Sequence, residues 1–234
     1  MSFVTSKKII DTLPDDFLSF TVYGHRRIGK TIFSLLVATE VYNTIEDCGI
    51  EKAYKMALGS LVFSIEDVVN IVDKHSLHNK KPVVIWDDVG IHASGLMYHA
   101  KQTEFADLKA QMDIIGDSVN CLILTTPSFK GLVSFLKTYD EMRVKITRAN
   151  SNYQRIAQFY STSTLPSGTM NLRKEWNDRY SIKLKDDWYL PYVKKREAAK
   201  KELTDYLKIR IQEKKDYKAQ QLKKMAANNY ERSY

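Results

Sequence analysis

One short stretch of this sequence has the residue types and the spacing that hold a phosphate group. Residues 24–31 read GHRRIGKT and match the pattern G-x-x-x-x-G-K-[ST]. Glycines let a loop turn its backbone N–H groups toward an anion, and a helix beginning near Lys30 adds the positive end of its dipole. The Lys30 ammonium would reach the β- and γ-phosphates of a nucleotide, and the Thr31 hydroxyl would bind Mg²⁺. We therefore predict an ATP and Mg²⁺ site whose nucleotide contacts come from this loop and the turn after it: Gly24, His25, Arg26, Arg27, Ile28, Gly29, Lys30, Thr31 and Phe33.

A pair of acidic residues supplies the second half of the predicted site. Residues 83–88 read VVIWDD, an apolar strand that ends in two carboxylates. Asp87 would bind Mg²⁺ as the acidic partner of Thr31, directly or through water. Asp88 is the candidate for orienting or deprotonating the attacking water. Many hydrolytic ATPases carry the longer Glu at that place, and Glu104 is a more distant alternative for the same role.

A third strand offers a polar side chain that could sense the γ-phosphate. Residues 122–128 read LILTTPS, and either Thr125 or Thr126 fits the role. We take Thr126 as the catalytic candidate, beside Lys30 and Asp88. The alternative is that both threonines are ordinary residues at the end of a strand.

The elements that must position these residues alternate between strand and helix. Strands are expected at 17–23, 61–63, 82–86, 120–126 and 141–148, and helices at 30–48, 51–58, 64–78, 97–115 and 130–136. This order and the unbroken apolar strands favour an α/β fold with a doubly wound, mainly parallel sheet. A hairpin turn at 150–152 and a strand at 179–184 would extend the sheet with antiparallel strands. We predict a phosphate-loop core over 1–149, a β extension over 150–189 and a basic helical tail over 190–234.

Charge and composition narrow the function classes. The chain has 234 residues, a formal net charge of +8 and two cysteines, Cys48 and Cys121. A zinc site of paired thiolates is excluded, whereas a disulfide between these two cysteines stays open. No apolar run approaches the length of a membrane span, and the first residues do not resemble a secretory signal, so a cytoplasmic protein is expected.

Most of the excess charge lies at the C-terminal end. Residues 190–234 contain 13 Lys and Arg against six acidic residues, which leaves the preceding part of the chain almost neutral. A basic tail favours polyanionic partners, nucleic acid first and an anionic membrane surface second. We expect DNA to bind along Lys194–Lys224, with tyrosines that could stack on bases. Packed rings on a solvated helix are the equal alternative.

The order of these elements resembles the P-loop ATPases of the AAA+ and RecA-like kind. DDVG at 87–90, QTEF at 102–105 and LILTTPS at 122–128 are similar to the DnaA and DnaC/IstB group, and composition and size resemble ATPases of archaeal viruses and plasmids. The resemblance covers residues 15–148 and implies ATP hydrolysis in replication initiation, helicase loading, or translocation and packaging. Residues 150–185 read as β where AAA+ proteins add a helical lid, which leans toward the RecA-like translocases.

Three alternatives remain at the level of the sequence. The first is an ATPase that drives a DNA-linked process; a nucleotide-gated adaptor with little hydrolysis and a small-molecule kinase are the others. ATP is only weakly favoured over GTP. A homo-oligomeric ring would need an arginine that reaches the neighbour's γ-phosphate, and Arg143, Arg148 and Arg155 are candidates, although exposed strand arginines are the commoner outcome.

Overall fold

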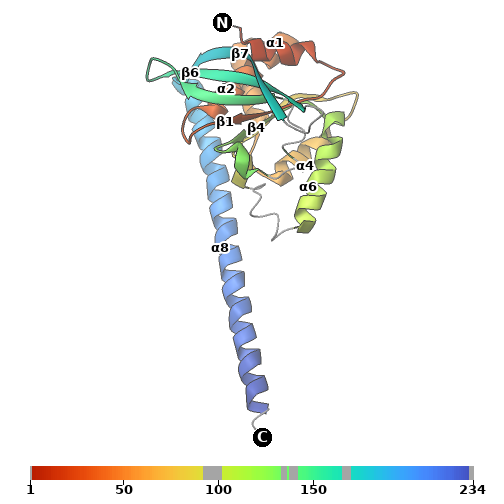
Figure 1. Ribbon diagram of the computed structural model, residues 1–234, viewed down its shortest axis with the longest axis vertical. Helices are drawn as coiled ribbons and strands as arrows, with labels where there is room; N and C mark the ends of the chain where they lie inside the picture. The colour runs from red at the N-terminus through yellow and green to blue at the C-terminus, as the bar shows by residue number, and fades with distance from the viewer. Residues whose placement is uncertain (1, 92–101, 133–135, 137–141, 165–169, 232–234) are drawn as a thin grey trace. The chain divides into compact units, whose positions relative to one another are not determined.

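The chain divides into two compact units, Met1–Leu184 and Lys185–Tyr234. The computed structural model describes residues 2–91, 102–132, 136, 142–164 and 170–231 (Figure 1). The first unit contains a sheet with helices on both faces, and the second is one long helix. The predicted site falls entirely within the first unit.

One sheet contains every strand of the first unit that the structure describes. Its order is β2-β3-β4-β1-β5-β6-β7, parallel from β2 to β5 and antiparallel from β5 to β7. Because β4 lies between β1 and β3, the carboxyl ends of these three strands meet at one edge of the sheet. The strands are β1 (Leu18–Tyr23), β2 (Leu61–Val62), β3 (Lys81–Trp86), β4 (Val119–Thr126), β5 (Met142–Arg148), β6 (Gln154–Thr164) and β7 (Met170–Ser181).

Helices cover the two faces of the parallel strands, as crossover connections require. On one face, α4 and α6 pack on an apolar cluster that includes Trp86 and Leu122 (Figure 1). On the other face, α2 places Phe33 against Phe159 of β6, and α1 packs beside α2. The helices are α1 (Val4–Asp11), α2 (Lys30–Glu46), α3 (Ile50–Gly59), α4 (Ile65–Lys74) and α6 (Gln102–Ile114), with short 3-10 turns η1 (Val89–Ile91), η2 (Ile115–Asp117) and η3 (Phe129–Gly131).

The predicted fold class is confirmed: the sheet is mainly parallel, is extended by antiparallel strands and is followed by a basic C-terminal helix. Ser64 is the N-cap of α4 and forms a reciprocal capping box with Asp67. The predicted hairpin joins β5 to β6. The 3-10 turn η3 covers only the start of the helix expected over 130–136, and residues 133–135 lie outside the described residues. Residues 97–101, the start of the helix expected over 97–115, also lie outside them.

In the first unit, one strand begins earlier than predicted and one helix was not predicted. The strand expected at 179–184 begins much earlier, at Met170, because β7 is an edge strand whose exposed polar residues mask its alternation. Helix α1 was not predicted. Its first N–H groups, those of Val4 and Thr5, donate to the Asp178 carboxylate on β7, so its N-terminal cap comes from a residue remote in the sequence.

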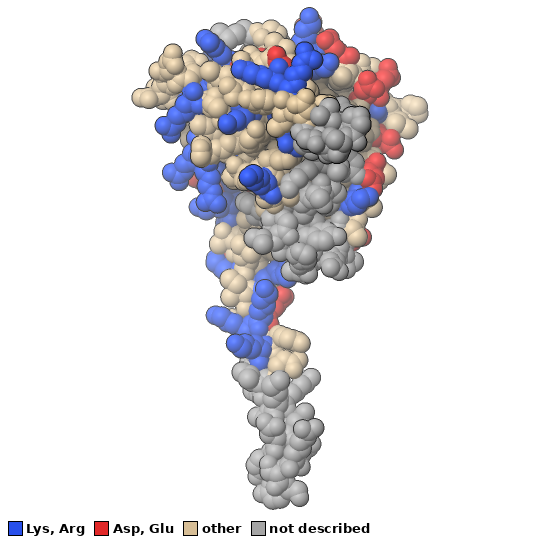
Figure 2. All heavy atoms as spheres, viewed as in Figure 1, with Lys and Arg blue, Asp and Glu red and all other residues tan. Residues whose placement is uncertain are grey.

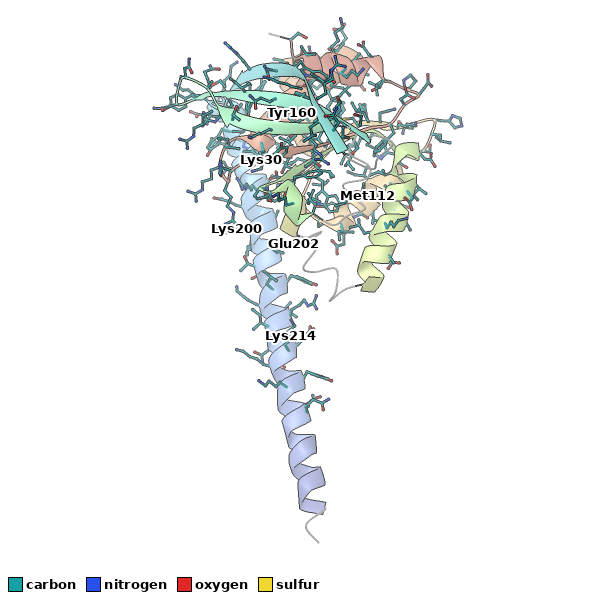
Figure 3. The ribbon with its side chains drawn as sticks, in the orientation of Figure 1. Lys30, Met112, Tyr160, Lys200, Glu202 and Lys214 are labelled. Carbon is teal, nitrogen blue, oxygen red and sulfur yellow. The ribbon has the colours of Figure 1, made fainter. Side chains whose placement is uncertain are left out.

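The second unit is the 46-residue helix α8 (Asp186–Glu231). It begins at Asp186, ahead of the predicted Leu190, because Asp186 and Asp187 in its first turn favour the positive end of a helix dipole. Pro191 lies inside the helix. Its central apolar side chains are exposed: Tyr206, Leu207, Ile209, Ile211 and Tyr217. Lys200, Glu202 and Lys214 project from it in Figure 3.

Both cysteines are free thiols, so the disulfide that the sequence left open does not form. Cys121 lies within β4, and burial raises the pKa of its thiol. Cys48 is only partly buried. Among the described residues, no helix is long and apolar enough to cross a membrane.

Candidate nucleotide-binding site

The loop between β1 and α2 is curled by residues with left-handed backbone conformations. Gly24, Arg27 and Gly29 have φ angles of 151°, 62° and 104°. These angles favour glycine, which explains why the two glycines of the motif are needed at its ends. The Ile28 N–H donates to the His25 carbonyl at 3.3 Å and closes the curl.

Lys30 begins α2, and its side chain folds back over this loop. Its Nζ donates to the carbonyl oxygens of Gly24 at 3.2 Å and His25 at 3.3 Å. The side chain is almost entirely buried. The ammonium therefore lies where the loop could enclose an anion, and the two carbonyls hold it there.

A hydroxyl and a carboxylate meet beside the loop, as the sequence predicted. Thr31 Oγ1 donates to Asp87 Oδ1 at 2.7 Å, and Asp87 follows β3 directly. Both residues are buried. Oxygen ligands of this kind are those that Mg²⁺ prefers, so the pair fits a magnesium ion bound with a nucleotide.

Thr125, rather than Thr126, completes this cluster. Thr125 Oγ1 donates to Asp87 Oδ1 at 2.5 Å and accepts the Asp88 N–H at 3.0 Å. The Thr126 hydroxyl instead exchanges hydrogen bonds with the backbone of Ser128. The structure thus brings the alternative threonine, Thr125, to the carboxylate, while the catalytic role predicted for Thr126 stays a prediction.

Asp88 has a strained backbone, with a φ angle of 49°. Non-glycine residues in this region cost free energy, and they are concentrated at functional sites. Asp88 is half-buried, directly follows Asp87 after β3, and donates its N–H to the Thr125 hydroxyl. This position is compatible with the predicted role toward a water molecule. Glu104, the distant alternative, falls where side chains are not described.

Two predicted contact residues have different roles in the structure. Phe33 is fully buried, and its ring lies 5.1 Å from that of Tyr180 and 6.1 Å from that of Phe159, so it belongs to the core and offers no surface to a nucleotide. Arg155, a candidate finger toward a neighbouring subunit, is also buried. Its Nε donates to the Ile28 carbonyl at 2.9 Å within the same chain.

Residues of the antiparallel extension hold the phosphate loop in place. This contact was not predicted from the sequence. Tyr180 on β7 donates its hydroxyl to the Gly29 carbonyl at 3.1 Å, beside the Arg155 contact with Ile28. In a trans peptide the carbonyl and the next N–H point in opposite directions. The carbonyls of Ile28 and Gly29 are anchored by residues outside the loop. The N–H groups of Gly29 and Lys30 therefore point to the opposite side, toward the inside of the loop.

The same arginine also fixes the hairpin that carries it. Arg155 Nη1 donates to the carbonyls of Asn152 and Gln154, both at 2.8 Å. Burial raises the pKa of the Tyr180 hydroxyl, and the nearby Arg155 charge opposes this to a smaller extent. Tyr180 consequently remains a protonated donor throughout the physiological pH range.

We expect Tyr180→Phe to weaken Mg-ATP binding about three- to tenfold, because it removes one neutral hydrogen bond worth about 0.5–1.5 kcal/mol from a group that orients the loop. Titration calorimetry measures this. Tyr42→Phe is the matched control, since Tyr42 is a buried tyrosine that also donates to a backbone carbonyl at 3.1 Å, that of Val83. Equal effects of both variants on nucleotide affinity would contradict an orienting role for Tyr180.

The fold and the loop together define the class: this is the P-loop NTPase fold, a mainly parallel sheet in which a GHRRIGKT loop joins β1 to α2. No protein-family model matches the chain. Protein B-251 of Sulfolobus spindle-shape virus 1 is 27% identical over 199 residues, covering 82% of this chain and 78% of that protein.

Two solved structures align with much of this chain. The genome packaging NTPase of Sulfolobus turreted icosahedral virus 2, in complex with ATP-gammaS, is 14% identical with a TM-score of 0.36, covering 68% of this chain and 98% of that chain. The N-terminal domain of zonular occludens toxin from Neisseria meningitidis is 14% identical with a TM-score of 0.43, covering 74% and 97%.

Proposed function

We propose that this chain binds Mg-ATP and hydrolyses it. The observation that carries the proposal is the meeting of three predicted groups in one place: Lys30 over the phosphate loop, and Thr31 of α2 bonded to Asp87 at the end of β3. Residues remote in the sequence converge there with the charges that a nucleotide and its metal ion require. The neighbouring Thr125 adds a hydroxyl to this cluster, since it donates to Asp87 and accepts the Asp88 N–H.

Each group has a distinct part in the proposed reaction. The loop N–H groups bind the phosphate oxygens, and the Lys30 ammonium leaves its two carbonyl partners to neutralise the β- and γ-phosphates. Thr31 and Asp87 hold Mg²⁺, which withdraws charge from the phosphates. Asp88 accepts a proton from the attacking water or orients it, and Thr125 or Thr126 detects the γ-phosphate.

The proposed use of this activity is a DNA-linked process, such as replication initiation, helicase loading or packaging. The excess of Lys and Arg in α8, along Lys194–Lys224, supports a polyanionic partner. The antiparallel extension supports a RecA-like arrangement over an AAA+ one with a helical lid. Arg26 and Arg27 are exposed on the loop, where a neighbouring copy in a homo-oligomer could contact them.

One observation favours a second candidate, an adaptor gated by ATP with little hydrolysis. The residue beside Asp87 is the short Asp88, held by a strained backbone, so its carboxylate has little reach. Such a protein would bind ATP tightly and release phosphate very slowly. It would act through a partner protein recruited in the ATP-bound state.

Steady-state phosphate release distinguishes these candidates. The full chain is assayed alone, with single-stranded DNA and with duplex DNA, at low and moderate salt. Turnover that DNA stimulates, and that falls as salt rises, supports the DNA-linked ATPase. Tight ATP binding without turnover under every condition supports the adaptor, and absence of ATP binding overturns both.

Asp88→Asn should reduce turnover about a hundredfold while leaving the Kd for Mg-ATP within about twofold, because it removes a base that acts on water. Asparagine tolerates a positive φ, so the backbone should keep its conformation. Phosphate release and calorimetry on the same preparation read the two effects separately. Unchanged turnover would exclude Asp88 as the base, and the measurement would then move to Glu104→Gln.

A further inference from the structure

The antiparallel extension carries a net positive charge that the net charge of the whole chain does not show. Residues 1–141 contain 14 Lys and Arg against 18 acidic residues, so that part is acidic. Residues 142–184, by contrast, have two acids, Glu175 and Asp178, and eight cations: Arg143, Lys145, Arg148, Arg155, Arg173, Lys174, Arg179 and Lys183. The extension is therefore a second basic region, separate from α8.

Strand alternation sorts these side chains onto two faces. The inner face is buried: Val144 and Ile146 on β5, Phe159 on β6 and Asp178 on β7. Phe159 there stacks on Trp176 with ring centroids 4.7 Å apart. The alternate residues all point to the opposite side, which we call the outer face.

The outer face consists of three rows of directly paired residues. The rows are Arg143–Tyr160–Lys174, Lys145–Gln158–Asn177 and Thr147–Ile156–Arg179. All nine residues are exposed or partly exposed. The rows contain four cations and no carboxylate, and Glu175 in the adjacent bulge accepts a hydrogen bond from Ser161 and lies 3.8 Å from Arg173.

Figure 2 agrees with this distribution. In its view, Lys and Arg atoms are spread over the region where β6 and β7 lie in Figure 1, whereas much of the acidic surface of the first unit lies on the side of α1 and α6. A surface with one sign of charge raises the local concentration of counter-ions of the other sign. The outer face therefore suits a partner with regularly repeated negative charges.

An aromatic ring lies within the basic rows. Tyr160, labelled in Figure 3, pairs with Arg143 on one side and Lys174 on the other. Its hydroxyl donates to Gln158 within the same face at 3.3 Å. Cations that contact phosphates around a ring that can stack on a base are the combination used to bind single-stranded nucleic acid.

We propose that the outer face of β5, β6 and β7 binds a single strand of nucleic acid, with Lys145, Lys174 and Arg179 on its phosphates and Tyr160 against a base. This deepens the proposed function, because it rests on nucleic acid being the partner. It adds a docking surface on the unit that holds the nucleotide site. Helix α8 is then a second contact rather than the principal one.

The proposal also places the nucleic acid on the strands that hold the phosphate loop. Ile156 and Arg179 of the outer face are each adjacent in the chain to an inner-face residue that anchors the loop, Arg155 and Tyr180. A nucleic acid strand bound to the outer face would stiffen this part of the sheet. Stimulation of ATP turnover by single-stranded DNA follows as an expected consequence.

Fluorescence anisotropy of a labelled 30-nucleotide single strand, measured without nucleotide, tests the surface. The variant Lys145→Gln/Lys174→Gln/Arg179→Gln in the full chain should bind at least about tenfold more weakly near 100 mM salt. The slope of log K against log salt should fall by about two in magnitude, because each lost phosphate contact contributes about 0.7. Tyr160→Ala should weaken binding about tenfold with an unchanged slope.

Two further triple variants serve as comparisons, and circular dichroism verifies that each is folded. Lys52→Gln/Lys55→Gln/Lys74→Gln removes three exposed lysines of α3 and α4 and should bind like the wild type. Lys200→Gln/Lys201→Gln/Lys208→Gln removes the same charge from α8. Full loss of binding in this α8 variant, with wild-type binding by the outer-face variant, would overturn the inference and leave the proposed function intact.

Other results are equally decisive. A wild-type chain that hydrolyses ATP but binds no nucleic acid overturns the inference and the DNA-linked role, while the ATPase itself stands. Binding to vesicles containing phosphatidylserine that requires the outer-face cations, without binding to the labelled strand, would assign the surface to a membrane instead. Preference for duplex over single strand, with no effect of Tyr160→Ala, would overturn the stacking arrangement.

Discussion

Lys30→Ala should lower the affinity for Mg-ATP at least about a hundredfold and turnover about a thousandfold. The ammonium is placed over the phosphate loop by two carbonyls, at 3.2 and 3.3 Å. Alanine removes the positive charge nearest the expected phosphates, and hydrogen bonds to charged groups contribute about 1.5–3 kcal/mol each. Titration calorimetry with ATP-gammaS and phosphate release with ATP measure the two losses.

The same substitution should change stability much less than it changes function. The Gly24 and His25 carbonyls that lose their donor belong to a partly exposed loop, so water can replace the ammonium. Lys52→Ala, on the exposed side of α3, controls for the loss of a lysine as such. ATP affinity within twofold of wild type in Lys30→Ala would remove the nucleotide site from the loop.

Local sequence patterns were sufficient for part of the site because its chemistry depends on short-range geometry. The GHRRIGKT motif determines the positions of Lys30 and Thr31, because both directly follow its short loop. The apolar strand before Asp87 places that carboxylate at the edge of the sheet, where it meets Thr31. The choice between Thr125 and Thr126 could not be made in this way. Every residue of β4 is buried, so burial alternation gives no indication of which hydroxyl faces Asp87.

The anchoring of the loop could not be predicted because it depends on long-range packing. Arg155 and Ile28 are 127 positions apart, and Tyr180 and Gly29 are 151 apart. The sequence did contain one indication of this contact. Arg155 lies two positions before Ala157 and four before Phe159, so in a strand all three side chains point to the same, buried face. A buried arginine needs acceptors, and the loop carbonyl is one of them.

Phe33 illustrates the opposite error, in which proximity in the sequence was taken for proximity to the ligand. The residue follows the phosphate-binding motif closely, and its N–H donates to the Gly29 carbonyl as the first turn of α2 forms. That turn directs the ring away from the loop and into the aromatic core with Tyr180 and Phe159. The loop and the core are thus joined through Tyr180, which contacts both.

Gly29→Ala should be the most damaging single substitution in the loop, costing about 3–5 kcal/mol of stability together with nucleotide binding. A Cβ at Gly29 would lie 2.5 Å from Ile182 Cγ2, and the backbone φ there is +104°. Strain in the left-handed region costs about 1–3 kcal/mol, and overpacking adds about as much again. The Ile182 backbone cannot easily retreat, since its N–H donates to the Tyr153 carbonyl at 2.9 Å.

Two other glycines separate these contributions. Gly49 has a φ of +79°, and a Cβ at that position would meet nothing within 4 Å, so Gly49→Ala should show the strain alone. Gly59 has neither strain nor a close neighbour, and Gly59→Ala should change stability by less than about 1 kcal/mol. Urea unfolding of the three variants gives the comparison, and adding Ile182→Ala to Gly29→Ala should recover the overpacking part. If Gly29→Ala were no more destabilising than Gly49→Ala, Ile182 would not pack tightly against the loop at Gly29, and the overpacking part of the expected cost would be refuted.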